Sequence, residues 1–176
     1  MRKALGFLAL LLVLILGVAG FGAFAVQRSL APTREARAIA EGWPADAGTR
    51  ITIDLDSLGV PTVRGTSELA LAFGQGYAHA RDRRFQMELL RRTASGRLAE
   101  LVGRAALNSD RFFRTLGFAA VADSGVARLS PRRRALFDAY SAGVNAWDAA
   151  HPAPPEFLLL GATPEPWSAS ESAFSM

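Results

Sequence analysis

One stretch of this chain sets its architecture: GQGYAHARDRRFQMELLRR, residues 74–92. Apolar residues recur in it and just before it at steps of three to five, close to helical spacing; they are Leu69, Phe73, Tyr77, Ala80, Phe85 and Leu89. Most charged residues fall around the other faces, namely Arg81, Asp82, Arg83, Arg91 and Arg92. The pattern predicts one long helix with one buried side, capped by Thr66 or Ser67 and stopped by Gly96.

Two glycines lie inside this helical pattern. Gly74 and Gly76 each cost a helix about 1 kcal/mol relative to alanine, yet they stand among apolar positions of the buried side. A glycine that interrupts a helix usually has a packing reason. We therefore expect the helix backbone to pack closely against another element at this point.

The segment before the helix has the pattern of a β-hairpin. Ile51, Ile53 and Leu55 alternate with polar residues, residues 56–59 supply turn chemistry, and residues 60–64 form a second extended segment. Pro61 has no N–H to donate, so it fits best at a sheet edge.

Two further helices are predicted directly after Gly96. A short one covers residues 97–102 and ends at Gly103. The next begins at a capping residue among residues 108–110. Its inner positions follow one another at three to four residues and are Phe112, Leu116, Ala119 and Asp123.

Another helix opens at Ser130 and Pro131, which stand in the preferred N-cap and N1 positions. It ends at His151–Pro152, and its inner face consists of Leu136, Tyr140, Val144 and Trp147. Residues 152–155 are rich in proline and predicted to be extended.

The last ten residues contain the S-x-x-E spacing of a capping box, at residues 168–171. This spacing predicts a helix start. The sequence continues for little more than one turn beyond it, and so short a helix is not stable alone. We expect the chain to be a fragment of a longer fold.

The N-terminus has the character of a membrane-targeting segment. Residues 4–26 carry no charge and follow Arg2 and Lys3; as a helix they would reach about 34 Å, enough to cross a hydrocarbon core of about 30 Å. We favour a retained anchor, while the small-x-small pattern at residues 23–25 leaves a cleaved signal peptide open. An apolar helix inside the globular core is disfavoured, because the segment has no polar face.

This segment sets the expected organisation and location of the chain. Residues 1–26 form the anchor or signal, residues 27–48 a linker rich in Ala, Arg, Gly and Pro, and residues 49–176 the folded domain. We expect the domain to face the periplasm or cell exterior on its anchor, or to be secreted or periplasmic if the leader is cleaved.

Composition narrows the possible functions. The chain has no cysteine, so disulfides, thiolate nucleophiles and cysteine-ligated metals are excluded. Its formal charge is +4, of which Arg2 and Lys3 supply two. With arginines interleaved among acids, this small excess does not indicate nucleic-acid binding. Residues 81–84 and 132–134 are instead expected to form solvated or ion-paired helix faces.

No group of residues stands out as catalytic. His79 lies inside the long helix, where a packed or hydrogen-bonded role is favoured, and His151 stands at a helix end, where a capping role is favoured. The carboxylates Asp82, Glu88 and Glu100 could be offered as acid–base groups, but structural ion pairing is favoured, with Asp82 or Glu88 meeting an arginine three or four residues away. No nucleophile elbow, phosphate-binding loop, zinc motif or calcium loop is present.

Several segments of the sequence resemble a known protein family. Residues 74–103, GQGYAHARDRRFQMELLRRTASGRLAELVG, resemble the small subunit of the penicillin acylase family of N-terminal-nucleophile hydrolases. Four other segments agree in order and spacing, and they are residues 58–61 (LGVP), Asp110 with Arg114, residues 140–147 (YSAGVNAW) and residues 164–167 (PEPW). The resemblance covers residues 51–176. At the hairpin, residues 55–56 (LD) and 61–62 (PT) depart from the Arg-Asp and Pro-His of many members.

The resemblance implies an α+β fold class. The whole fold would be a four-layer αββα sandwich, to which this mostly helical portion with its N-terminal β-hairpin contributes. The whole protein would be an amidohydrolase that cleaves itself and exposes Ser, Cys or Thr at the start of a large β subunit. The α-amino group of that residue would act as the base, because its reference pKa is near 8.

The resemblance also implies what this chain lacks. The small-subunit residues known to bind calcium or line the acyl pocket align beyond Met176, so no catalytic, cofactor or metal residue is assigned here. The expected partners are the large-subunit segment, a membrane through residues 4–26 and a small-molecule amide; calcium is a possible ion of the full-length protein. This portion alone is expected to be inactive. A membrane-tethered interaction module without catalysis remains the alternative.

Overall fold

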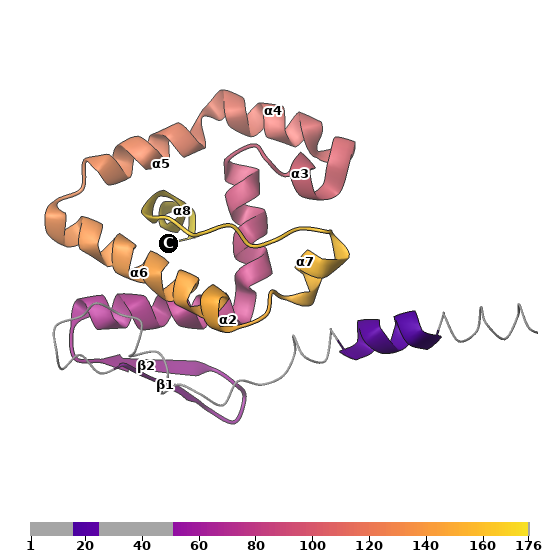
Figure 1. Cartoon of the computed structure of the whole chain (residues 1–176). Helices are drawn as coiled ribbons and strands as arrows, with labels where there is room; N and C mark the ends of the chain where they lie inside the picture. Colours follow the sequence, from indigo (N-terminus) through magenta and orange to yellow (C-terminus); the bar gives the residue numbers. More distant parts are fainter. Residues whose placement is uncertain (1–15, 25–50, 176) are drawn as a thin grey trace, which may run out of the picture. The chain divides into compact units, whose positions relative to one another are not determined.

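The computed structural model describes residues 16–24 and 51–175 (Figure 1). The chain divides into two compact units, Met1–Thr33 and Arg34–Met176. Within the first unit, residues 16–24 are helical with mostly exposed side chains. Among the helices of the described residues, none has both the length and the apolar character needed to cross a membrane. Most of the predicted membrane segment, residues 4–26, and the predicted linker, residues 27–48, lie outside the described residues.

The second unit opens with the predicted hairpin. Strands β1 (Ile51–Leu55) and β2 (Pro61–Gly65) pair antiparallel, with Ile51 opposite Gly65 and Leu55 opposite Pro61. The Asp56 carboxylate forms the turn by accepting the N–H groups of Leu58 and Val60 at 2.9 and 2.8 Å.

The long helix is present, but it is bent. Helix α2 (Glu68–Ala94) begins at the N-cap Ser67, whose hydroxyl accepts the N–H of Ala70 at 3.1 Å. It ends at Ser95, followed by Gly96 in the left-handed conformation. At Arg83 the backbone leaves helical geometry, with φ −149° and ψ 35°. The prediction of one continuous helix is therefore wrong at this residue, and Figure 1 shows the two halves of α2 running in different directions.

Helix α6 (Pro131–Ala150) packs along α2, with glycines at the contact. A Cβ built on Gly76 would lie 2.0 Å from the Tyr140 carbonyl oxygen, and one built on Gly143 would lie 2.0 Å from that of Phe73. Gly74 is covered instead by Val63 of the hairpin. The expected close backbone approach is confirmed, because no side chain fits between these elements.

The inner face of α6 follows the prediction. Tyr140 and Val144 are fully buried, and Leu136 and Trp147 are partly buried. Ser130 is the N-cap and Pro131 occupies the first turn, as expected. At the other end the ring Nδ1 of His151, the C-cap residue, lies 3.0 Å from the carbonyl oxygen of Trp147.

The region between α2 and α6 differs from the prediction. The short helix α3 (Ala99–Val102) and the 3-10 turn η2 (Gly103–Ala106) lead into α4 (Leu107–Leu116) and α5 (Phe118–Ala127). The single helix predicted from residues 108–110 onward is two helices, because Gly117 adopts φ +70° and ends the first. Phe112 and Leu116 of its predicted inner face are 58% and 48% exposed.

Asp110 also has a different role from the predicted N-cap. It lies inside α4, and its two carboxylate oxygens accept the N–H groups of Leu98 and Ala99 at 2.8 and 2.9 Å. It thereby caps the preceding helix α3, whose first N–H groups have no partner within that helix.

Two short helices complete the second unit. Helix α7 (Pro155–Leu159) lies partly in the segment predicted to be extended, which is therefore extended only before Pro155. Helix α8 (Ala169–Ser175) begins where the capping box predicts, and the Glu171 carboxylate accepts the N–H of Ser168. Helix α8 packs against α5, α6 and α2.

Candidate functional site

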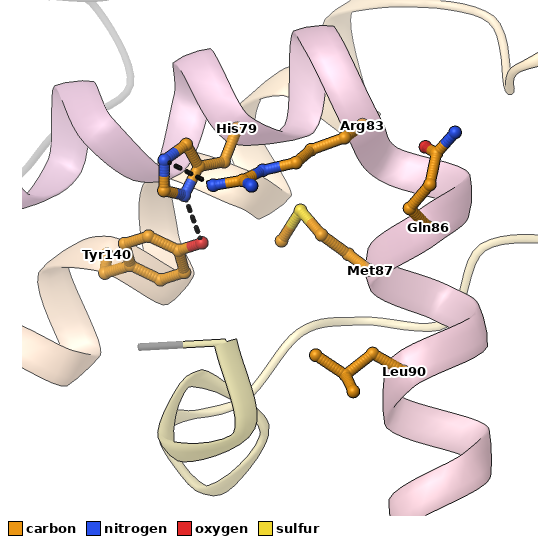
Figure 2. Close-up of a pocket in the computed structure, with 6 residues that line it drawn as sticks. All are labelled: His79, Arg83, Gln86, Met87, Leu90 and Tyr140. Carbon is orange, nitrogen blue, oxygen red and sulfur yellow. Dashed lines mark hydrogen bonds between the residues drawn. The ribbon is translucent and has the colours of Figure 1, made fainter.

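A small hollow lies beside the bend in α2 (Figure 2). Its volume is about 120 Å³. Five lining residues come from α2 and one from α6; they are His79, Arg83, Gln86, Met87, Leu90 and Tyr140. The bend at Arg83 separates His79 from Met87 and Leu90, so the two halves of α2 contribute a polar wall and a largely apolar wall.

The polar wall is a chain of hydrogen bonds with a defined direction. A terminal guanidinium nitrogen of Arg83 lies 2.8 Å from Nε2 of His79, and Nδ1 of His79 lies 2.9 Å from the Tyr140 hydroxyl. Arginine can only donate, so Nε2 must accept and the imidazole proton resides on Nδ1. His79 therefore donates to the Tyr140 oxygen.

The protonation of His79 follows from the same geometry. Burial lowers the pKa of His79, the positive charge of Arg83 lowers it further, and the negative charge of Asp82 opposes the shift. A neutral imidazole whose lone pair is already bound to Arg83 cannot accept a proton without breaking that bond. In this arrangement His79 positions Arg83 and Tyr140.

Next to the hollow, α2 carries a buried ionic cluster. Glu88 is completely buried, and three arginines of the same helix converge on it. Arg84 and Arg91 bind one carboxylate oxygen, and Arg92 binds the other at 2.6 Å. Arg91 and Arg92 were predicted to lie on the outer faces of the helix, and this is wrong, because Glu88 draws them into the interior.

The cluster extends to other elements through a second set of acids. Arg84 donates to Asp148 of α6 at 2.8 Å, and Arg92 binds both Glu100 of α3 and Glu165. Arg97 also pairs with Glu100 and Glu165, and Arg91 pairs with Glu171 of α8. The ionic cluster thus joins α2 to α3, α6, α8 and the segment before α8.

The pKa values of the acids reflect these contacts. Burial would raise the pKa of Glu88, but hydrogen bonds from Arg91 and Arg92 and the charge of Arg84 bring it below the usual value. Hydrogen bonds from Arg97 lower the pKa of both Glu100 and Glu165. Asp148 is the exception, since burial raises its pKa against the opposing charge of Arg84.

Residues 164–167 are fixed by both the cluster and α6. The guanidinium carbons of Arg84 and Arg91 each lie 5.4 Å from the ring centre of Trp167, within cation–π distance. The side-chain amide of Asn145 accepts the Trp167 N–H at 2.7 Å and donates to its carbonyl at 2.9 Å. The Trp167 ring N–H donates to the Ser172 hydroxyl, which also bonds Ser141.

The other residues that the sequence offered as catalytic candidates make structural contacts. Asp82 pairs with the adjacent Arg81, and Glu88 and Glu100 belong to the ionic cluster. The ring of His151 stacks on Trp147 with centres 3.5 Å apart. Within residues 16–24 and 51–175, no group of three His, Cys, Asp or Glu side chains could hold a metal ion.

Sequence reasoning missed the burial of the ionic cluster and the contribution of Arg83 to the hollow. The cluster had a signal in the sequence, since Arg84, Arg91 and Arg92 each stand three or four residues from Glu88. No signal in the sequence indicates that Glu165 and Asp148 belong to the ionic cluster, because both residues bind arginines of α2 that are more than 60 positions away in the chain. The hollow depends on the bend at Arg83, which no proline or glycine at that position announces.

Comparison with known proteins identifies relatives of this chain. Residues 50–176 match the family model described as Penicillin amidase. The penicillin acylase 2 proenzyme of Pseudomonas sp. (strain SE83) is 41% identical over 118 residues, which are 66% of this chain and 15% of that protein. The acyl-homoserine lactone acylase QuiP of Pseudomonas aeruginosa is 37% identical over 165 residues, covering 90% of this chain and 19% of that protein.

A solved structure agrees with these sequence relatives. A thermostable penicillin G acylase from Alcaligenes faecalis superposes with a TM-score of 0.65 at 30% sequence identity. The superposition covers 72% of this chain and 69% of that one. The chain spans only 15% to 19% of the length of the two curated relatives named above. The family match covers most of the chain, including the ionic cluster and the hollow, and the chain belongs to the penicillin amidase family.

Proposed function

We propose that this chain is the N-terminal, largely helical portion of an acylase-like amidohydrolase, which hydrolyses the amide between an acyl group and an amine. The observation that carries the proposal is the family match over residues 50–176, together with relatives of which this chain spans less than a fifth. In the complete protein this portion would form part of a four-layer αββα sandwich, and self-processing would release the large subunit.

In this proposal the large subunit supplies the catalytic groups and this chain supplies their structural support. Amide hydrolysis by covalent catalysis needs a nucleophile and a base within hydrogen-bond reach. In this proposal the large subunit brings both, as a terminal Ser, Cys or Thr and its own α-amino group. The residues described here supply the rigid support: the ionic cluster holds α2, α3, α6 and residues 164–167 in one arrangement.

For the substrate we propose only the chemical class. Two named relatives are acylases of penicillin and of acyl-homoserine lactones, and both reactions cleave a linear amide. We include β-lactam side chains and acyl-homoserine lactones among the candidate substrates. We also propose that residues 4–26 carry the domain to the periplasm or cell exterior.

A chimeric proenzyme tests the function. Residues 50–176 of this chain would replace the matching segment of the Pseudomonas sp. SE83 penicillin acylase 2 proenzyme. We expect the chimera to hydrolyse a chromogenic acyl amide, with the unaltered proenzyme as positive control. The 176-residue chain alone, assayed on the chromogenic amide and on an acyl-homoserine lactone, should show no turnover above a heat-treated sample.

The outcomes separate the alternatives. Turnover by the chain alone would contradict the division of the chemistry between two portions. A chimera that folds, as judged by circular dichroism, and yet remains unprocessed and inactive would favour the interaction module without catalysis. If Glu88→Gln abolishes turnover in the chimera and Asp138→Asn does not, the ionic cluster is the part of this chain that supports the catalytic portion.

A further inference from the structure

Arg83 differs from the other arginines of α2 in its partners. Each of the other four pairs with at least one carboxylate: Arg81 with Asp82, Arg84 with Glu88 and Asp148, Arg91 with Glu88 and Glu171, and Arg92 with Glu88, Glu100 and Glu165. Within residues 16–24 and 51–175, no carboxylate lies within ion-pair distance of Arg83, whose hydrogen bond goes to the neutral ring of His79. Arg83 is exposed, and within the described part of the chain its positive charge has no direct carboxylate partner.

This charge stands at the rim of the hollow, where Arg83 is one of the lining residues. The bond to Nε2 of His79 holds the guanidinium against the polar wall, and it uses one of the five N–H donors of an arginine. Figure 2 shows the Arg83 side chain running from the bend back toward His79, with Met87 projecting beside it. The unused donors provide the planar fork that binds a carboxylate through two parallel hydrogen bonds.

The rest of the hollow suits a short apolar group. Met87 and Leu90 form the wall on the second half of α2, and methionine adapts its shape to small ligands. The volume of about 120 Å³ is well below the roughly 300–1,000 Å³ of pockets for drug-sized ligands. The size of a short aliphatic acid matches this volume, whereas a β-lactam or a long acyl chain exceeds it.

We propose that the hollow between the two halves of α2 and Tyr140 binds a short organic carboxylate, whose carboxylate pairs with Arg83 and whose alkyl group packs on Met87 and Leu90. His79 is the positioning residue, because its hydrogen bond orients the guanidinium. Carboxylate binding here does not depend on the hydrolytic function proposed above.

A titration of the full 176-residue chain tests the proposal. The chain is labelled with carbon-13 in its methionine methyl groups and kept in detergent micelles, and sodium butyrate replaces sodium chloride at constant sodium concentration. The chain has three methionines, and Met87 is the one among the described residues that lines the hollow. We expect its methyl resonance, assigned with Met87→Leu, to shift saturably with half-saturation at about 1–10 mM, as expected for a ligand of this size.

Butyramide, which has the same shape without the charge, is the matched ligand control. We expect it to bind at least about tenfold more weakly than butyrate, because it cannot accept a charge-assisted bidentate bond. Equal shifts with the two compounds, or no saturable shift with butyrate, would overturn the proposal. This comparison needs only the unaltered chain, so it is decisive even if variants fold poorly.

A pair of variants assigns the charge to Arg83. We expect Arg83→Gln to weaken butyrate binding at least about tenfold, and Arg81→Gln, which alters an arginine already paired with Asp82, to leave it unchanged. Arg83→Lys, which keeps the charge but loses the planar fork, should bind with intermediate affinity. Unchanged binding in a folded Arg83→Gln variant would refute the assignment.

Discussion

The backbone of Gly76 lies directly against the carbonyl group of Tyr140, and a Cβ at Gly76 would fall 2.0 Å from that oxygen. This contact fixes the distance between α2 and α6, and it also places the Tyr140 side chain where it meets His79. One glycine in a helix, unfavourable for the helix by itself, thus sets both the main helix packing and one wall of the hollow.

Gly76→Ala should strongly destabilise the domain. The methyl group would meet backbone atoms, which cannot rotate away as a side chain can, so we expect a loss of at least about 2 kcal/mol in the free energy of unfolding. Gly125→Ala is the matched control, because apart from its chain neighbours and the nearby backbone of its own helix no atom lies within 4 Å of a Cβ at this glycine. It should stabilise by about 0.5–1 kcal/mol. Urea denaturation followed by circular dichroism measures both, and equal effects would contradict the close packing.

Glu88→Gln should be more damaging than loss of a surface ion pair. Glu88 is the shared partner of three buried or nearly buried arginines, and removing its charge leaves positive charge in the interior, at a cost of about 3 kcal/mol or more. Asp138→Asn removes one half of the exposed Arg134–Asp138 pair and should cost no more than about 1 kcal/mol. The same denaturation experiment distinguishes the two, and a small loss in Glu88→Gln would show that the cluster does not hold the fold.

The stability of the domain should fall in acid. The pKa values of Glu88, Glu100 and Glu165 are lowered from the ordinary 4.5, so the folded state binds fewer protons than the unfolded state. Their contribution is fully present above about pH 4.5 and is lost as the pH falls through the lowered values. Asp148, with its raised pKa, has the opposite sign and offsets part of this loss.

Denaturation series between pH 3 and pH 7 measure this dependence. The unaltered chain should lose stability with each step below about pH 4.5, and Glu88→Gln should show a shallower decline because one of the linked groups is gone. A stability that is flat from pH 7 to pH 3 would contradict the lowered pKa values.

His79 should be neutral near neutral pH, with its proton on Nδ1. Its pKa should lie below the usual 6.5, because burial and then the charge of Arg83 both disfavour the imidazolium. Long-range nitrogen-15 spectra of the imidazole report both the tautomer and the titration. Arg83→Gln should raise the pKa, whereas Arg134→Gln, outside the hollow, should leave it unchanged. Observation of the Nε2–H tautomer would contradict the direction of the hydrogen bonds from Arg83 to Tyr140.

Local chemistry was enough to predict much of the fold. The alternation of Ile51, Ile53 and Leu55 predicted the hairpin, Ser67 and Gly96 marked the ends of α2, and the capping box at residues 168–171 marked the start of α8. These signals act between neighbours within a few residues, so they can be recognised without knowing what lies across the core. Segment order and spacing also sufficed to place the chain in its family.

Interactions across the fold decided the rest. The bend at Arg83, the division of α4 from α5 at Gly117 and the burial of Arg91 and Arg92 were all predicted wrongly or not at all. The helical pattern predicted that Arg91 and Arg92 lie on outer faces of α2. An arginine can be buried instead when an acid such as Glu88 pairs with it, because the ion pair offsets much of the free-energy cost of removing the charge from water. The partners that join α2 to distant segments depend on tertiary structure alone, and so does the hollow that forms where α2 bends.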